Sequence, residues 1–140
     1  MSGFDKAAAE AIVRDKLAPW IQDLDLRVDA VSADEVVLRV PYDDKLARVG
    51  GMVCGQAMMA LADTAMIFVV SAVNGGFVEM ATTNITTSFF RPILGKDMIA
   101  RGRALKTGRL LVFGEVTIYA DGDDRPAAHA TSTYALPPSR

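Results

Sequence analysis

The period of hydrophobic and polar positions changes several times along the chain, and each change predicts a different element. Residues 5–16 are rich in alanine and in charged residues, which predicts a helix that Pro19 ends or bends. Two stretches in which apolar residues alternate with polar ones follow, and alternation of this kind predicts strands. The alternating apolar positions are Leu24, Leu26 and Val28 in the first stretch, and Val36, Leu38 and Val40 in the second.

The longest apolar run predicts one long helix over residues 54–73. It follows a charged loop at 43–52 that contains Gly50 and Gly51, and Asn74-Gly75-Gly76 ends it. A membrane-spanning helix needs about 20 apolar residues, and a central Asp such as Asp63 costs about 2.5–3.5 kcal/mol on insertion. We therefore expect a core helix of a soluble protein and no membrane partner.

The remainder of the chain predicts four strands, at residues 81–90, 97–106, 111–120 and 127–136. A helix that is apolar nearly all round must be covered on most sides. A single curved antiparallel sheet wrapped around it would provide that cover, which favours the α+β class. Small residues on the strand faces would let the helix come close: Ala100, Gly102, Ala104 and Gly114. The 140-residue length predicts one domain, 1–140.

Composition removes several function classes. The 15 basic and 17 acidic residues give a formal charge of −2, which argues against a dedicated nucleic-acid binder. A single cysteine cannot form an internal disulfide or a cysteine-based zinc site. No segment has P-loop, dinucleotide or zinc spacing, so we expect no metal or redox cofactor. The N-terminal residues lack a signal-peptide pattern, so we expect a cytoplasmic protein.

Asp63 is the residue that most needs an explanation, because a charged side chain is rarely buried without a partner. The predicted helix holds no Lys, Arg or His. In one interpretation, Asp63 is a structural residue bonded to amides or hydroxyls, such as Thr64 or a strand threonine. In the other, it is a catalytic carboxylate at the wall of a cleft.

The start of the same helix carries a second candidate site. The first amides of a helix are unpaired and lie at the positive end of its dipole. Gly55 would allow a ligand to approach these amides closely, and an amide there could hold an oxyanion. The alternative is a glycine that only serves a turn or close packing.

Together these segments resemble the hotdog-fold thioesterases of the phenylacetate-degradation (PaaI-like) branch. The resemblance covers residues 35–136 and rests on two runs, GGMVCGQAMMALADTAM and TTNITTSFFRPILGKD. It implies a curved antiparallel sheet around one long central helix. It also implies a hydrolase that cleaves acyl-CoA thioesters, with coenzyme A as part of the substrate, and a homodimer that is often paired into a homotetramer.

The resemblance also implies roles for individual residues. Gly55 would supply the oxyanion amide, Asp63 the carboxylate that attacks or activates water, and Thr82 a hydroxyl that helps to hold the water. The family commonly has His-Gly-Gly at the helix start and an amide residue some six positions upstream. Here these positions hold Cys54-Gly55-Gln56 and Arg48. A second function therefore stays open, namely an acyl-CoA binding or sensing protein without turnover.

Helix geometry gives an independent expectation about assembly. Gly55 and Asp63 are eight residues apart, which is about 12 Å along one helix at 1.5 Å per residue. A reacting atom must lie about 3 Å from both an oxyanion donor and the nucleophile or its water. If both residues act on one thioester, they must come from two antiparallel helices of a dimer with two shared sites.

Other residues are candidates for substrate contacts. Cys54 could be a nucleophile at a helix start or a buried small residue, and Gln56 could bond the substrate or a partner chain. Met59 could line an acyl pocket, and Arg91 belongs to the aromatic-x-Arg-Pro motif of the resemblance.

Lys106 and Arg109, at a predicted hairpin tip, are candidates for binding coenzyme A phosphates. The full basic group also contains Lys96, Arg101 and Arg103, and a solvated strand face is the alternative. The lone histidine, His129, is expected to be structural.

Overall fold

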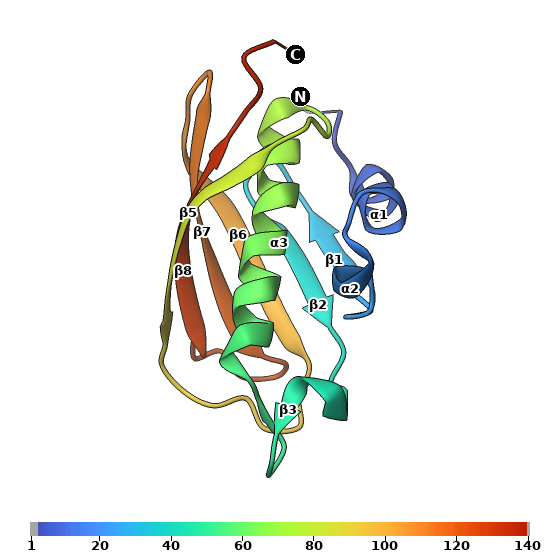
Figure 1. Ribbon diagram of the computed structural model, residues 1–140, viewed down its shortest axis with the longest axis vertical. Helices are drawn as coiled ribbons and strands as arrows, with labels where there is room; N and C mark the ends of the chain where they lie inside the picture. The colour runs from blue at the N-terminus through green and yellow to red at the C-terminus, as the bar shows by residue number, and fades with distance from the viewer. Residues whose placement is uncertain (1–2, 140) are drawn as a thin grey trace.

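The computed structural model describes residues 3–139, so residues 1, 2 and 140 of the predicted domain lie outside the description. A six-stranded antiparallel sheet curves around one long helix, and two shorter helices lie to one side of it (Figure 1). This arrangement confirms the predicted α+β hotdog fold. The helices are α1 (Lys6–Asp15), α2 (Pro19–Gln22) and α3 (Gly55–Asn74). The strands of the sheet are β1 (Arg27–Val31), β2 (Val36–Val40), β5 (Ala81–Phe89), β6 (Met98–Thr107), β7 (Leu111–Ala120) and β8 (Ala128–Ala135).

The order of strands places β5 at an edge of the sheet. The order is β1-β2-β6-β7-β8-β5, and every neighbouring pair is antiparallel. The chain leaves the end of α3, forms β5 at the far edge, and returns through β6 in the middle of the sheet. β5 therefore pairs with β8 on one side only, and most of its residues are exposed.

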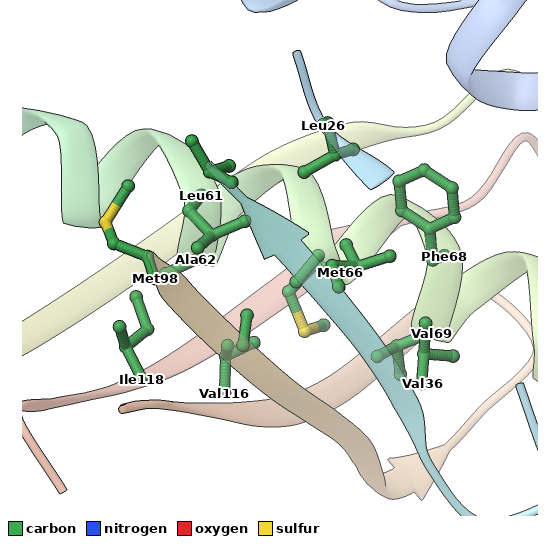
Figure 2. Close-up of a cluster of buried hydrophobic side chains, with 14 of the residues drawn as sticks. Leu26, Val36, Leu61, Ala62, Met66, Phe68, Val69, Met98, Val116 and Ile118 are labelled. Atoms are coloured by element: carbon green, nitrogen blue, oxygen red, sulfur yellow. The ribbon is translucent and has the colours of Figure 1, made fainter. Parts of the chain in front are cut away.

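The core lies between α3 and the sheet face that it covers. Apolar side chains from α3 interdigitate with others from β2, β6 and β7 (Figure 2). A Cβ atom on Gly102 would lie 2.8 Å from Val69 Cγ2, and one on Gly114 would lie 2.7 Å from the end of Met66. These distances are too short for a real side chain, so the predicted small residues do allow the close approach of α3.

α3 is the core helix that the sequence predicts. By length and composition it could cross a membrane, but 67% of its most apolar window is buried inside the structure. The helix ends at Gly75, which adopts the left-handed conformation, and the Gly76 amide bonds the Ser71 carbonyl at 2.8 Å. This is the glycine-dependent termination expected from Asn74-Gly75-Gly76.

The strand predicted to begin at Leu24 begins only at Arg27. Leu24 and Leu26 are buried as the alternation suggested, but Asp25 between them has a φ of 59° and forms part of a turn. Residues before it form the short helix α2, in which Pro19 occupies the first turn. A proline suits that position, because its missing N–H has no partner there in any helix.

The loop predicted over 43–52 contains regular structure. It holds the 3₁₀ helix η1 (Asp44–Leu46) and a small hairpin of β3 (Ala47–Arg48) and β4 (Met52–Val53). Gly50 and Gly51 have φ values of 97° and 82° and form the turn of this hairpin. The hairpin leads directly into α3 and so fixes where that helix begins.

Candidate active site

Two neighbouring strands direct hydroxyl groups at the Asp63 carboxylate. Asp63 is half-buried in the middle of α3. Thr82 Oγ1 donates to Asp63 Oδ1 at 2.8 Å, and the Tyr134 hydroxyl lies 2.6 Å from the same oxygen. The Tyr134 hydroxyl also lies 2.7 Å from the Asp63 carbonyl oxygen. Thr82 on β5 and Tyr134 on β8 are direct cross-strand partners, so the sheet register brings the two hydroxyls together.

The buried Tyr134 side chain can serve only as a neutral hydrogen-bond partner at ordinary pH. Burial and the neighbouring Asp63 carboxylate both raise the pKa of Tyr134 far above its usual value, with burial the larger cause. The phenol therefore keeps its proton and can donate a hydrogen bond to the carboxylate. Hydrogen bonds to a charged acceptor are stronger than neutral ones, so Asp63 is held in one orientation.

The second carboxylate oxygen of Asp63 is differently placed. Among residues 3–139, no protein donor bonds Asp63 Oδ2. Asp63 also lines a cavity of about 260 Å³ between α3 and the α1–α2 connection. One oxygen is thus anchored, and the other is free to act on water or a ligand.

The start of α3 presents the unpaired amides that the sequence predicts. Within the described part of the chain, the Gly55 and Gln56 amides donate to no protein acceptor, and Cys54 gives no side-chain cap. A cavity of about 380 Å³ adjoins Gly55. The Phe89 ring lies 3.4 Å from where a Cβ atom of Gly55 would be, so the ring covers part of this glycine. A negative charge at this point would be stabilised by the positive end of the helix dipole.

Other predicted contact residues gather around the start of α3. Arg91 lines the Gly55 cavity and donates from Nη1 to the Pro126 carbonyl at 2.7 Å. Arg48, which stands where the family commonly has an amide residue, also lines this cavity. Cys54 and Gln56 line a separate cavity of about 310 Å³.

Met59 is partly exposed on α3, one turn before Asp63. Lys106 lies near the end of β6 and Arg109 in the β6–β7 turn, and they line neither the Gly55 cavity nor the Asp63 cavity.

The predicted basic group divides into paired and unpaired members. Arg101 bonds Glu35 at 2.9 Å, and Arg103 bonds Glu115 at 2.6 Å. His129 also bonds Glu115, at 2.9 Å. The hydrogen bonds from His129 and from Arg103 both lower the pKa of Glu115. In the described chain, Lys106 and Arg109 have no carboxylate partner. The single histidine of the chain, His129, bonds Glu115 rather than Cys54, and no described cluster of His, Cys, Asp or Glu could hold a metal ion.

Tyr134 is the site residue that sequence reasoning missed. A signal was present, because alternate residues of β8 face the core: Ala128, Ala130, Ser132 and Tyr134. Tyr134 is the large polar member of this otherwise small series. Its inward position follows from the alternation, but its contact with Asp63 depends on how β8 lies against α3.

The fold and this site define a hotdog protein with a carboxylate at mid-helix and free amides at the helix start. Residues 50–127, more than half of the chain, match the family model described as the Thioesterase superfamily. The chain belongs to this superfamily, as the resemblance predicted.

Similar proteins agree with this assignment. A Silicibacter sp. TM1040 protein described as a "putative thioesterase" is 33% identical, with a TM-score of 0.86 over 99% of this chain and 95% of that one. The PaaI protein from the phenylacetic acid degradation operon of E. coli shares the fold. It has a TM-score of 0.79 and 16% identity, over 94% of this chain and 91% of that one. The "Putative esterase Ta0293" of Thermoplasma acidophilum is 26% identical over 117 residues, covering 84% of this chain and 87% of that protein.

Proposed function

We propose that this protein hydrolyses acyl-CoA thioesters to a free acid and coenzyme A. The observation that carries the proposal is the hydrogen bonding of the Asp63 carboxylate in a chain of the thioesterase superfamily. Thr82 and Tyr134 hold one of its oxygens, and the other has no protein partner among the described residues. A fixed carboxylate with one free oxygen suits a general base or a nucleophile.

The reaction can follow either of two routes. As a base, Asp63 takes a proton from water while the water oxygen bonds the thioester carbon. As a nucleophile, Asp63 bonds that carbon itself, and water later cleaves the resulting anhydride. In both routes the carbonyl oxygen becomes an oxyanion, which the Gly55 N–H stabilises. The carbon–sulfur bond then breaks and releases the coenzyme A thiolate. In the base route the thiolate takes the proton that Asp63 removed from water. In the nucleophile route it takes a proton from solvent, and water then cleaves the anhydride.

One subunit cannot bring Gly55 and Asp63 to the same thioester. Both lie on α3, eight residues apart, or about 12 Å along the helix. We therefore propose a homodimer in which Gly55 of one subunit faces Asp63 of the other. The unpaired edge of β5 supports this assembly, because a second copy could extend the sheet there. Pairing of two dimers into a homotetramer belongs to the same proposal.

The substrate itself supplies coenzyme A, so the proposed reaction needs no separate cofactor. Lys106 and Arg109, which lack carboxylate partners in the described chain, are the proposed contacts for its phosphates. Gln56, Cys54, Met59 and Arg91 are the proposed contacts nearer the thioester. A cytoplasmic location completes the proposal, because acyl-CoA thioesters are intracellular metabolites.

A panel of acyl-CoA thioesters tests the proposal. Thiol release would be measured for short, long, branched and aromatic acyl groups, beside equilibrium binding of the same compounds. Hydrolysis with saturation kinetics is the expected result. Tight binding without turnover would favour the second candidate, an acyl-CoA binding or sensing protein. The observation favouring that candidate is the helix start, where Cys54 and Gln56 flank Gly55 without the family histidine. The absence of both hydrolysis and binding would overturn both candidate functions.

A further inference from the structure

Two cavities lie along one side of α3, and Trp20 is a lining residue of both of them. The cavity beside Asp63 has a volume of about 260 Å³, and we name it the Asp63 cavity. The cavity beside Gln56 has a volume of about 310 Å³, and we name it the Gln56 cavity. The Asp63 cavity is lined by Lys16, Leu17, Ala18, Trp20, Ile21, Ala60, Asp63, Thr64 and Ile67. Ala60 lines the Asp63 cavity and Ala57 lines the Gln56 cavity, and these two alanines are one helical turn apart on α3. The two cavities therefore adjoin, and both reach Trp20.

The segment that carries Trp20 is held in place on both sides. The Gln22 side chain donates from Nε2 to the Leu17 carbonyl at 2.7 Å, which closes the turn around α2. Lys45 Nζ donates to the Asp23 carbonyl and so links α2 to η1. Trp20 is nevertheless 62% exposed, and burial in a protein interior therefore does not explain this large aromatic side chain.

The Asp63 cavity suits an apolar group of a substrate whose reacting carbon lies beside the Asp63 carboxylate. Most of its lining is aliphatic or aromatic. The Lys16 ammonium lies 5.1 Å from the centre of the Phe77 ring, which does not line the cavity, so its charge has a partner elsewhere. Sites for whole ligands usually occupy about 300–1,000 Å³. A space of about 260 Å³ therefore suits the acyl part of a thioester rather than all of acyl-CoA.

Building on the proposed function, we infer that the Asp63 cavity is the acyl pocket and that Trp20 ends it. The acyl group extends from the thioester carbon at Asp63 along α3 until it meets the indole. Trp20 thereby restricts the substrate to short acyl groups or a single aromatic ring. Without the indole, the Asp63 and Gln56 cavities would join, and longer chains would fit.

A series of straight-chain acyl-CoA thioesters tests this role through kcat/KM. Trp20→Ala should move the preferred chain length upward and raise kcat/KM roughly 15- to 60-fold for two to three added methylenes, as burial of that surface implies. Trp20→Phe keeps an aromatic wall and should shift the preference less. Phe113→Ala removes another partly exposed aromatic, on β7, and should leave the preference unchanged. An unchanged preference in an active Trp20→Ala enzyme would overturn the inference.

Fluorescence provides a second test that does not depend on turnover. Trp20 is the chain's single tryptophan, so its emission reports directly on this wall. In Asp63→Asn protein, short-chain acyl-CoA should change the emission saturably, whereas free coenzyme A should not. Equal changes with free coenzyme A, or acyl-CoA binding that leaves the emission unchanged, would contradict the inference. Loss of both hydrolysis and binding across the whole panel would instead overturn the proposed function.

Discussion

At the scale of single residues, the main feature is a carboxylate placed in an apolar helix without a cationic partner. Burying a charge is costly unless hydrogen bonds replace its water. Asp63 obtains these bonds from Thr82 and Tyr134, so a structural and a catalytic Asp63 would share the same contacts. Sequence reasoning reached Thr82 through the family resemblance. It missed Tyr134, which is 71 residues from Asp63 and meets it only through the packing of β8.

Replacing Asp63 with Asn separates the structural from the catalytic role. The amide oxygen can still accept the two hydroxyl bonds, so we expect the fold to persist. The negative charge and the basicity are lost, and turnover should fall by about 10²–10⁴, the range for a positioned acid–base group. Steady-state kinetics and circular dichroism would measure the two effects. Asp34→Asn, at an exposed turn, is the control. Folded Asp63→Asn protein with near-wild-type turnover would show that Asp63 is structural.

Tyr134→Phe tests whether the orientation of the carboxylate matters. The change removes one donor to Asp63 and leaves the ring in place. We expect turnover to fall about 10- to 100-fold, because small misplacements of a reacting group carry costs of that size. Single-turnover kinetics would measure the chemical step. Tyr119→Phe on β7, whose hydroxyl has no hydrogen bond among the described residues, is the matched control. Equal rates in the two variants would rule out a positioning role for Tyr134.

At the scale of elements, the sequence predicted what periodicity controls and missed what local contacts control. α3 has a long apolar run and the strands β5 to β8 are each eight to ten residues long, and the structure places them within a few residues of the prediction. α2, β3 and β4 have four residues or fewer, which is too short for a period to show. The glycine turn at 50–51 and the contact of α2 with η1 fix these pieces. They also form the surroundings of Gln56 and Gly55.

One carboxylate joins β2 to the start of β6 and makes stability depend on pH. Asp97 accepts the Tyr42 amide at 2.8 Å and the Arg39 guanidinium at 2.9 Å. The Tyr42 bond, followed by Arg39, lowers the pKa of Asp97 below its usual value. A carboxyl with a lowered pKa stabilises the fold above its unfolded pKa, about 3.9, and this stabilisation is lost as pH falls through the folded pKa.

Asp97→Asn should therefore lower the free energy of unfolding at pH 7 and have a smaller effect near pH 3. Urea unfolding of both proteins at several pH values would measure the difference. Asp34→Asn, which lacks an ion pair in the described chain, should show no such trend. A difference between Asp97→Asn and wild type that stays constant down to pH 3 would mean that packing, rather than charge, causes the loss.

At the scale of the whole molecule, the unpaired edge of β5 is the feature that most needs a partner. Long exposed edge strands lead to uncontrolled association unless they are covered or paired. β5 has nine residues, most of them exposed, and Thr82 on this strand contacts Asp63. A dimer formed through β5 would therefore place its interface beside the proposed site.

Mixing two inactive variants tests whether the site is shared between subunits. Gly55→Pro removes the proposed oxyanion amide, and Asp63→Asn removes the carboxylate. In a mixed dimer, one site receives both functional residues and the other receives neither. Random mixing makes about half of the dimers mixed, so roughly a quarter of wild-type activity should return if the sites are independent. Thiol release from the mixture would measure it.

The structure indicates that Gly55→Pro can fold. Cys54 has φ −73° and ψ 151°, a conformation suited to the residue before a proline, and Gly55 is the first residue of α3. Circular dichroism would check the fold, and native mass spectrometry would verify that subunits exchange. Verified mixed dimers without recovered activity would exclude a shared site of this form.

The position of α3 in the chain has a consequence for protein synthesis. α3 is complete at Asn74, whereas the strands that cover most of it end at Ala135. At about 5–20 residues per second, the ribosome needs roughly 3–12 s to make the intervening chain. During that time a helix apolar enough to cross a membrane lacks its cover. Asp63 is its one charged residue, and at mid-helix it opposes membrane insertion by about 2.5–3.5 kcal/mol. The carboxylate proposed for hydrolysis thus also helps to keep the nascent helix out of the lipid bilayer.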